Sequence, residues 1–362
     1  ILDAQEPSVA VDTAGKGHVF WVSQGPGDSS TNIYRRIVEA DGTLQGIEQV
    51  TNNASPEMSP DSSGAPDGTV HAVWTREYTS DPSEIYFVKS ENDILGTPLV
   101  YCANSIGISS TEAKITTDSE SHSHVVWRGF GGPDGSINKE GALIYYRRRQ
   151  NTTFMDNSWL EVSTYSTLCI GCTPKSHQPN IFVDSNDIAT VIWADNAPRA
   201  SLASCPSSSS ETLASTDFDI YLRRYSGNTT IDANFGNDVK YQGPDTCASD
   251  EDSSHPEVSA LDNGELIVTW IETDTNGKSV LKRVTQTNDS DGFLEFSAMA
   301  DFLEQDAESS SLEILRRAPN EFHYFWQEES VDDGSFPTLF FQDGDESPVG
   351  DSHVLHSTEK LD

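Results

Sequence analysis

The chain has 362 residues, and its 58 acidic and 22 basic side chains give a formal net charge of −36. Nucleic acids and anionic membrane surfaces are bound through clustered basic side chains, so this charge argues against both kinds of partner. Hydrophobic residues make up only 35% of the chain, but the seven Trp indicate a folded protein with a strongly solvated acidic surface. No apolar run is long enough for a membrane-spanning helix, so no membrane insertion is expected.

The beginning of the chain and its sequons suggest a cellular location. The sequence starts Ile1-Leu2-Asp3 without Met, which we interpret as a processed, mature form. Acceptor sequons, which favour exposed loops, begin at Asn53, Asn151, Asn228 and Asn288. A surface this acidic suits saline surroundings that screen its self-repulsion. The expected location is therefore secreted, either extracellular or periplasmic.

A repeated unit organises the whole chain. In its first copy an alternating strand starts at Pro7, an Asp–Gly turn follows, and a second strand ends at Trp21. A polar loop then leads to a third strand around Tyr34. Second strands of the same kind end at five further tryptophans, 53 to 77 residues apart: Trp74, Trp127, Trp193, Trp270 and Trp326. A period near fifty with about four short strands per unit is typical of a β-propeller.

The predicted fold is all-β. We expect one domain, residues 1–362, that forms a single six-bladed β-propeller of four-stranded antiparallel blades, with seven blades as the alternative. A blade cannot bury both faces of its own sheet, so neighbouring blades must pack face to face. The predicted blades span residues 1–56, 57–110, 111–176, 177–253, 254–308 and 309–362.

The repeat resembles a known propeller family. Its frame reads Pro-x-Val-x-Val-Asp from Pro7, His-Val-x-Trp from His18 and Ile-Tyr-x-Arg from Ile33, and it recurs along most of the chain. This frame resembles the sialidase-like, Asp-box type of propeller unit. The nearest approach to the Asp-box itself is the segment 90–97, which lacks the final Trp. The resemblance implies the propeller fold, while activity has to be argued from the site residues.

Arginines recur in the third strands of the repeat. A sialidase-like site would bind a substrate carboxylate through three arginines, because guanidinium pairs with carboxylate in a bidentate way. The chain has no Arg-Ile-Pro opening motif, and no Tyr–Glu nucleophile pair is assigned from the sequence. We therefore interpret the recurring basic residues as partners of the abundant acids: Arg35, Arg36, Arg147, Arg148, Arg223, Arg224, Lys282 and Arg283.

One face of the predicted propeller carries the long loops. The loops that follow Trp127 and Trp193 are long, whereas turns on the opposite face, such as 12–17, are short. Function tends to lie on the elaborated loops of a rigid scaffold, so the site is expected on the long-loop face. Acids follow the repeat tryptophans there and are either Ca²⁺ ligands or, as we prefer, solvated loop acids: Glu77, Asp195, Glu272 and Glu328.

Histidines fall into repeated and unique positions. His18, His71, His124 and His323 occupy corresponding positions near the start of the second strands, which favours a scaffold role in hydrogen bonding to a turn. A polysaccharide lyase needs a His or Tyr as acid or base and a cation that neutralises the uronate carboxylate. The catalytic candidates for such a set are His177, His255, Arg128 and Tyr78.

The chain has five cysteines. Cys169 and Cys172 are followed by His177 at zinc-like spacing, with Cys102 or Cys205 as a conceivable fourth ligand. A c-type haem site is excluded because no histidine follows Cys172 directly. Disulfides are the default in a secreted protein, and we favour them for Cys169, Cys172, Cys205 and Cys247, with a Cys205–Cys247 bridge across one long loop. The odd count leaves one thiol free or joined to another chain.

Two functions are compatible with these residues. The first is a non-catalytic recognition or assembly module that binds a glycan or an extracellular protein partner through the loop-rich face. The alternative is a carbohydrate-active enzyme, either a polysaccharide lyase or a sialidase-like glycoside hydrolase. We favour the first from the sequence alone, because no unique set of acid, base and nucleophile stands out.

Overall fold

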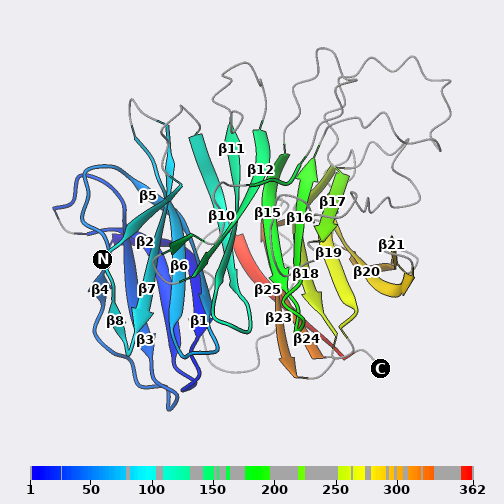
Figure 1. Ribbon diagram of the computed structural model, residues 1–362, viewed down its shortest axis with the longest axis horizontal. Coiled ribbons are helices and arrows are strands. Elements are labelled where there is room, and N and C mark those ends of the chain that lie inside the picture. The colour runs from blue at the N-terminus through cyan, green and yellow to red at the C-terminus, as the bar shows by residue number, and fades with distance from the viewer. Residues whose placement is uncertain are drawn as a thin grey trace. The chain divides into compact units, whose positions relative to one another are not determined.

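The computed structural model contains β-strands as its regular elements and no helix among the residues it describes (Figure 1). Every strand pair with a described register is antiparallel, so the all-β prediction is confirmed. The described residues form no helix long and apolar enough to cross a membrane. The structure describes residues 2–25, 27–78, 82–102, 109–130, 142–150, 153–154, 160–163, 176–195, 219–224, 252–261, 264–273, 279–290, 293–296, 300–304, 309–318, 321–329 and 352–360.

The chain divides into two compact units. The first comprises residues 1–191 and 223–237, and the second comprises residues 192–222 and 238–362. The described strands form six sheets, with three to five strands in each. Assembly of these sheets into a closed six-bladed ring stays a prediction.

Three complete sheets lie in the first unit. The first has the order β1-β2-β3-β4 and contains β1 (Leu2–Val11), β2 (Gly17–Gln24), β3 (Asn32–Val38) and β4 (Glu48–Gln49). The second sheet contains β5 (Glu57–Gly64), β6 (Val70–Arg76), β7 (Glu84–Glu91), β8 (Ile94–Leu95) and β9 (Leu99–Cys102). Its order is β5-β6-β7-β8, and β9 also pairs with β7. The third contains β10 (Ser109–Thr117), β11 (Ser123–Phe130), β12 (Ala142–Gln150), β13 (Thr153–Phe154) and β14 (Leu160–Glu161).

The remaining sheets follow in chain order. The fourth consists of β15 (Ser176–Val183), β16 (Ala189–Asp195) and β17 (Asp219–Arg224). The fifth contains β18 (Asp252–Ala260), β19 (Leu266–Thr273), β20 (Ser279–Ser290), β21 (Phe293–Phe296) and β22 (Ala300–Glu304). The sixth consists of β23 (Ser309–Ala318), β24 (Glu321–Glu329) and β25 (Ser352–Lys360).

The repeat tryptophan is paired with a tyrosine of the next strand. Trp21 and Tyr34 are register partners on β2 and β3, and their ring centroids are 6.0 Å apart in a stacked arrangement. The same stack recurs with centroid distances of 5.9 to 6.1 Å in three more sheets: Trp74–Tyr86, Trp127–Tyr145 and Trp193–Tyr221. The repeated tryptophan and tyrosine positions therefore form one recurrent cross-strand aromatic pair, although the loops between them differ in length.

Neighbouring sheets of the first unit bury apolar side chains against each other. On β6, Val70, Ala72 and Trp74 belong to a buried cluster shared with β1, β2 and β3, whereas Val73 belongs to a cluster shared with the third sheet. Successive side chains of a strand point to opposite faces, so β6 has an apolar neighbour on each side. The expected face-to-face packing is therefore present between these sheets.

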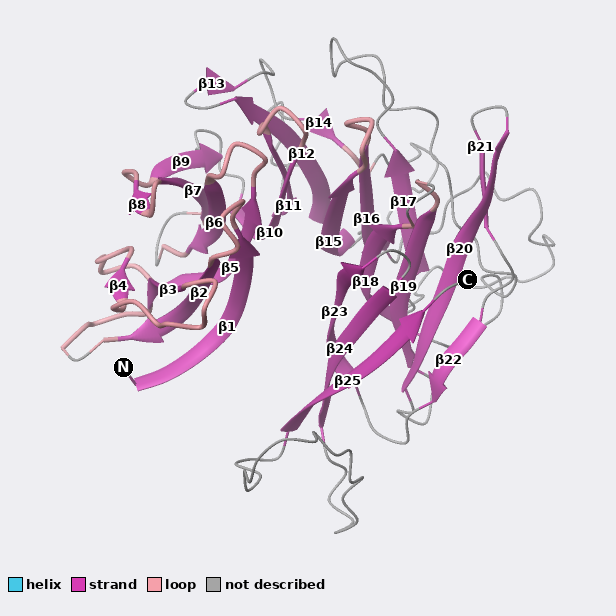
Figure 2. Cartoon of the chain, turned by 90° about the horizontal axis from the view of Figure 1, so that it is seen from below, coloured by secondary structure: helices cyan, strands magenta, loops and turns pink. Residues whose placement is uncertain are grey.

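The first strands of five sheets, β1, β5, β10, β18 and β23, carry a register shift near their beginning. Four residues within these shifts, Glu6, Ser59, Glu112 and His255, have φ near +50°. Gln178 has the same φ at the corresponding position of β15. Within the first unit, β1, β5, β10 and β15 are the edge strands of successive sheets and lie next to one another in that order (Figure 2). A bulge bends its strand and changes the direction of the side chains beside it, so these positions affect where the side chains at the beginning of each strand point.

Candidate functional site

A cluster of ionisable side chains lies at the end of the second sheet where β5 begins, β6 ends and β7 begins. The antiparallel register pairs Glu57 with Arg76, and Arg76 with Glu84. Tyr78 lies two residues after Arg76, the last residue of β6, and Tyr86 lies two residues into β7. These five residues are called the Glu57 cluster below.

Glu57 is fully buried beside a charged partner. Its Oε1 accepts hydrogen bonds from Arg76 Nε at 2.8 Å and from Asn53 Nδ2 at 2.9 Å, and Arg76 Nη2 lies 2.7 Å away. Its Oε2 is buried and has no hydrogen-bond partner in the described part of the chain. Burial raises the pKa of Glu57 to about 7, although Arg76 opposes that shift. A carboxyl group that titrates near neutral pH is typical of functional sites.

Glu57 makes the stability of the protein depend on pH. Its pKa in the folded state is about 7, against 4.5 ordinarily, so between these values the folded chain keeps a proton that the unfolded chain loses. The stabilisation that this proton uptake gives the folded state is complete below pH 4.5 and is lost as the pH rises through 7. We expect the free energy of unfolding to fall by about 3 kcal/mol across this window. Urea unfolding of the wild type and Glu57→Gln at both ends of the window measures it. An equal pH dependence in the two proteins would contradict the assignment.

Tyr78 lies within reach of a carboxylate and a second phenol. Its hydroxyl donates to Glu84 Oε2 at 3.0 Å, and its oxygen is 3.0 Å from the hydroxyl of Tyr86. The Arg76 guanidinium carbon lies 3.6 Å from the centre of the Tyr86 ring. Tyr78, Arg76 and Glu84 are all half-buried, so solvent reaches them. This arrangement provides a phenol with a proton acceptor and a cation beside it, which suits proton transfer next to an anionic substrate group.

Arg128 lies in a different cluster, in the third sheet. Its Nη1 is 2.7 Å from Glu112 Oε1, and the other oxygen of Glu112 accepts a hydrogen bond from the Gln178 backbone at 2.7 Å. The Glu112 carboxylate thus binds both Arg128 and the backbone of Gln178, and His177 is the residue before Gln178. Tyr78 makes its contacts within the second sheet. The predicted lyase residues of the first unit thus fall into two clusters.

Other predicted residues have identifiable surroundings. In the second unit His255 takes a φ of +50°, with Nδ1 3.2 Å from Ser254 Oγ. Asp195 and Glu272 each accept a hydrogen bond from the indole of their own repeat tryptophan, at 3.2 and 3.0 Å. Glu77 is exposed and lies just beyond the end of β6, one position further from its tryptophan than these two. The side chain of Glu328 lies outside the described residues.

Four of the five cysteines lie outside the described residues. They are the predicted zinc and disulfide residues Cys169, Cys172, Cys205 and Cys247. The fifth, Cys102, is a free, buried cysteine on β9. Burial raises the pKa of its thiol to about 11, so it stays protonated and unreactive near neutral pH.

Glu57, Arg76 and Glu84 were not among the residues proposed from the sequence. A signal was present at Arg76, which occupies the position two residues after a repeat tryptophan. The other repeats have small or acidic residues there: Ser23, Gly129, Asp195, Glu272 and Glu328. A basic residue at this single copy marks a departure from the scaffold pattern. No comparable signal marks Glu57 or Glu84, because their importance comes from strand register.

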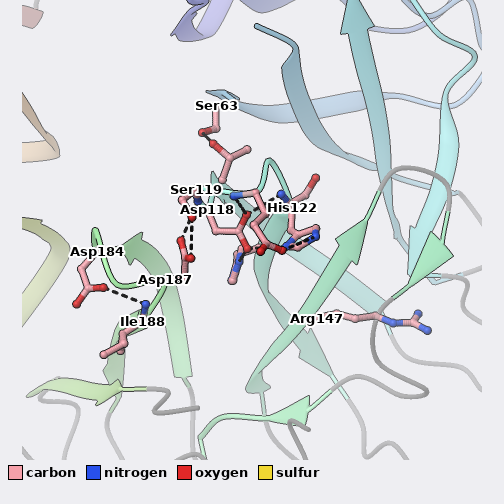
Figure 3. Close-up of polar contacts among 12 residues, drawn as sticks. Ser63, Asp118, Ser119, His122, Arg147, Asp184, Asp187 and Ile188 are labelled. Atoms are coloured by element: carbon pink, nitrogen blue, oxygen red, sulfur yellow. Dashed lines mark hydrogen bonds and ion pairs between the residues drawn. The ribbon is translucent and has the colours of Figure 1, made fainter. Parts of the chain in front are cut away.

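The opposite, short-turn ends of the sheets carry a polar network that serves the scaffold (Figure 3). In the third sheet Asp118 Oδ2 lies 2.8 Å from His122 Nδ1 and 3.1 Å from His124 Nε2. Asp118 Oδ1 accepts backbone hydrogen bonds within its own turn, and Ser119 of that turn contacts Asp187 of the next sheet. Both ring nitrogens of His124 are hydrogen-bonded, to Tyr146 and to Asp118, which supports the scaffold role predicted for this residue. The two histidines hold the pKa of Asp118 well below its usual range, against the effect of burial.

The fold is found in solved structures with little sequence identity to this chain. A protein of unknown function from Dyadobacter fermentans aligns with a TM-score of 0.58 at 8% identity, over 98% of this chain and 93% of the other. An ulvan lyase, described as a new family of polysaccharide lyase and bound to -[GlcA(1-4)Rha3S]-, aligns with a TM-score of 0.54 at 12% identity, over 90% and 76%. The Trypanosoma rangeli sialidase in complex with DANA aligns with a TM-score of 0.50 at 9% identity, and this chain covers 53% of it.

The sequence comparisons found no match: no family model and no curated protein sequence matches the chain. At identities of 8 to 12% the structural likeness shows the fold alone. The chain therefore has a propeller-type all-β fold like that of several carbohydrate-active enzymes.

Proposed function

We propose that the protein is a carbohydrate-active enzyme that cleaves a carboxylate-bearing polysaccharide by elimination, and that the Glu57 cluster is its active site. The observation that carries the proposal is the Tyr78–Glu84 hydrogen bond of 3.0 Å beside the Arg76 guanidinium. The likeness to the ulvan lyase supports a polysaccharide as substrate. This conclusion replaces the recognition module favoured from the sequence, because the cluster supplies the combination of groups that the sequence did not reveal.

Each residue of the cluster has a role in this proposal. Elimination at a uronate requires removal of the proton next to the carboxylate, and the resulting negative charge must be neutralised. Tyr78 passes its proton to Glu84 and takes the substrate proton, and Arg76 faces the substrate carboxylate. The oxygen that leaves the neighbouring carbon is protonated from the same phenol and carboxylate pair. A carbon–carbon double bond forms as the glycosidic bond breaks.

Glu57 regulates the charge that Arg76 presents to the substrate. When Glu57 is ionised it compensates Arg76, and when it is protonated the positive charge of Arg76 is available to an incoming carboxylate. Because the pKa of Glu57 is about 7, this change takes place near neutral pH. The KM for an anionic polysaccharide is therefore expected to be lower below pH 7 than above it.

The experiment that tests the proposal is an assay of the full chain on uronate-containing polysaccharides, with sialylated oligosaccharides alongside. Ultraviolet absorbance of the unsaturated product and the number of new reducing ends are measured in the same samples. Both should rise together if the reaction is elimination. Reducing ends without the double bond would assign hydrolysis instead. Binding without any cleavage would restore the recognition module.

Ionic strength should raise the rate on an anionic polymer. The chain carries a net charge of −36, so it repels a polyanion at long range. The Debye length shortens from about 30 Å at 0.01 M salt to about 8 Å at 0.15 M, which screens this repulsion. We expect kcat/KM to increase about tenfold between these concentrations. A neutral oligosaccharide fragment is the control, and a rate on the polymer that falls with salt would contradict this prediction.

A further inference from the structure

The turn between β1 and β2 and the turn between β7 and β8 bring three ligand-type side chains together. Asp12, His18 and Asp93 each offer one atom, and these atoms all lie within 4.8 Å of one another. Asp12 and His18 belong to the first sheet, and Asp93 belongs to the second. Both sheets are in the first unit. This set is called the turn cluster below.

His18 is the unusual member of its repeat. It is only 2% exposed, and neither of its ring nitrogens makes a hydrogen bond within the described residues. Its two equivalents with described side chains are satisfied: His71 contacts Ser123 Oγ at 2.7 Å and Thr69 Oγ1 at 3.0 Å, and His124 contacts Tyr146 and Asp118. Buried polar nitrogens without partners are rare and need an explanation such as an ion. A scaffold role accounts for the other two histidines and leaves His18 unexplained.

The distances within the turn cluster suit coordination better than hydrogen bonding. His18 Nε2 is 3.5 Å from Asp12 Oδ2 and 3.9 Å from Asp93 Oδ1. A charged imidazolium would hold carboxylates at about 2.7–2.9 Å. Two ligands of a tetrahedral zinc ion, each about 2.1 Å from the metal, lie about 3.4 Å apart. The distance from His18 Nε2 to Asp12 therefore matches the separation of two zinc ligands, and the distance to Asp93 is slightly longer than that separation.

The carboxylates of the turn cluster are held in place by their other atoms. Asp12 Oδ1 accepts backbone hydrogen bonds from Ala14 and Lys16, both at 2.9 Å. Asp93 Oδ2 forms an ion pair with Lys16 Nζ, and Arg35 Nη2 donates to the Asp93 carbonyl at 2.7 Å. Each aspartate thus keeps one oxygen directed toward His18 while its remaining groups are anchored. Such supporting contacts orient metal ligands in proteins.

The charge around the turn cluster favours a divalent cation. Lys16 also lies 3.5 Å from Glu39, and the Arg35 guanidinium contacts Glu48 at 2.6 Å. The carboxylates of Asp12, Asp93, Glu39 and Glu48 therefore face two permanent cations, which leaves two negative charges uncompensated. A divalent ion bound to these ligands would balance them.

We propose that Asp12, His18 and Asp93 bind a divalent transition-metal ion, with Zn²⁺ as the best match. The ion would link the first sheet to the second. One imidazole and two carboxylates are ligands that zinc accepts, and soft thiolates are not required. Strand β7 has eight residues. Glu84 of the Glu57 cluster is its first residue and Asp93 lies just beyond its last, so the ion is remote from that cluster. Its role is structural, and the inference is independent of the proposed function.

The test uses the full chain after treatment with a chelator. Zn²⁺ is added back, bound metal is counted by mass spectrometry, and affinity and melting temperature are measured. We expect one ion per chain and a higher melting temperature with zinc. His18→Gln and Asp93→Asn should each weaken binding at least about 100-fold. His71→Gln, which changes the equivalent histidine of the next sheet, should bind zinc as the wild type does.

Three results would overturn the inference. Zinc binding that survives in both His18→Gln and Asp93→Asn would place the ion elsewhere, and loss in Cys172→Ser would then assign it to the predicted cysteine site. Absence of stoichiometric zinc in the wild type would remove the site altogether. Tighter binding of Ca²⁺ than of Zn²⁺ in the same titration would contradict a transition-metal site. Asp93 is half-exposed in a turn, so Asp93→Asn is expected to fold even if His18→Gln does not.

Discussion

Replacing Tyr78 with Phe should lower kcat by about 10²–10⁴-fold while leaving the fold intact. The change removes one oxygen from a half-buried side chain whose hydroxyl donates to Glu84 and contacts Tyr86. The phenyl ring keeps its packing, so the loss reports proton transfer more than stability. KM should change little, because Arg76 still faces the substrate carboxylate. The measurement is a pair of kcat and KM values on the polysaccharide found to be cleaved.

The first sheet offers a matched control for this substitution. The Tyr34 hydroxyl donates to Asp28 Oδ2 at 3.1 Å, which is also a phenol–carboxylate contact near the start of a third strand. Tyr34→Phe should retain wild-type kcat, because the described contacts of Asp28 come from Tyr34 and from backbone and amide groups, with no arginine or second tyrosine among them. Equal losses in both variants would show that the effect of Tyr78→Phe is general. Wild-type activity in Tyr78→Phe would remove the phenol from the mechanism.

Replacing Trp127 with Ala should lower the free energy of unfolding by about 3–5 kcal/mol. Trp127 is 1% exposed and stacks on Tyr145 with ring centroids 5.9 Å apart. It also meets Tyr101 of the second sheet edge-on at 6.4 Å, so the cavity would open between two sheets. Chemical denaturation of the variant and the wild type measures the difference.

A second pair of substitutions keeps the stability prediction testable. Val11→Ala truncates a strand residue that is 59% exposed and should change stability by no more than about 0.5 kcal/mol. Trp127→Phe keeps part of the aromatic surface and serves if the alanine variant does not fold. A loss below about 1 kcal/mol in Trp127→Ala would contradict the role of the tryptophan in joining neighbouring sheets.

Features that recur along the chain could be predicted from the sequence. The second strands end near the repeat tryptophans, and tyrosines that recur at the corresponding position of four third strands stack on them, whatever the length of the loop between. Asp12, Asp118 and Asp184 each accept backbone hydrogen bonds two and four residues on, so the short Asp turns were also foreseeable. Repetition makes such positions visible without a structure.

Features that occur once could not be predicted in the same way. Glu57 is a single acid among many, and its raised pKa depends on burial and on the register that places Arg76 beside it. Similarly, His18 and Asp93 are 75 residues apart and belong to two different sheets, so their proximity depends on how these sheets pack. Tyr78 was identified in advance as a candidate, but its partner Glu84 depends on where β7 begins. Chemistry in this fold comes from contacts between non-repeated residues, which sequence spacing does not encode.

The most direct test of the active-site assignment is hydrogen–deuterium exchange of the Tyr78→Phe variant with and without an oligosaccharide of the cleaved polymer. The account predicts that bound sugar slows exchange in peptides covering residues 53–59 and 75–86. Peptides of the β1–β2 turn, residues 12–17, should exchange at the same rate in both samples. Protection confined to the third sheet around Arg128, or no protection in residues 53–59 and 75–86 at saturating sugar, would contradict the assignment.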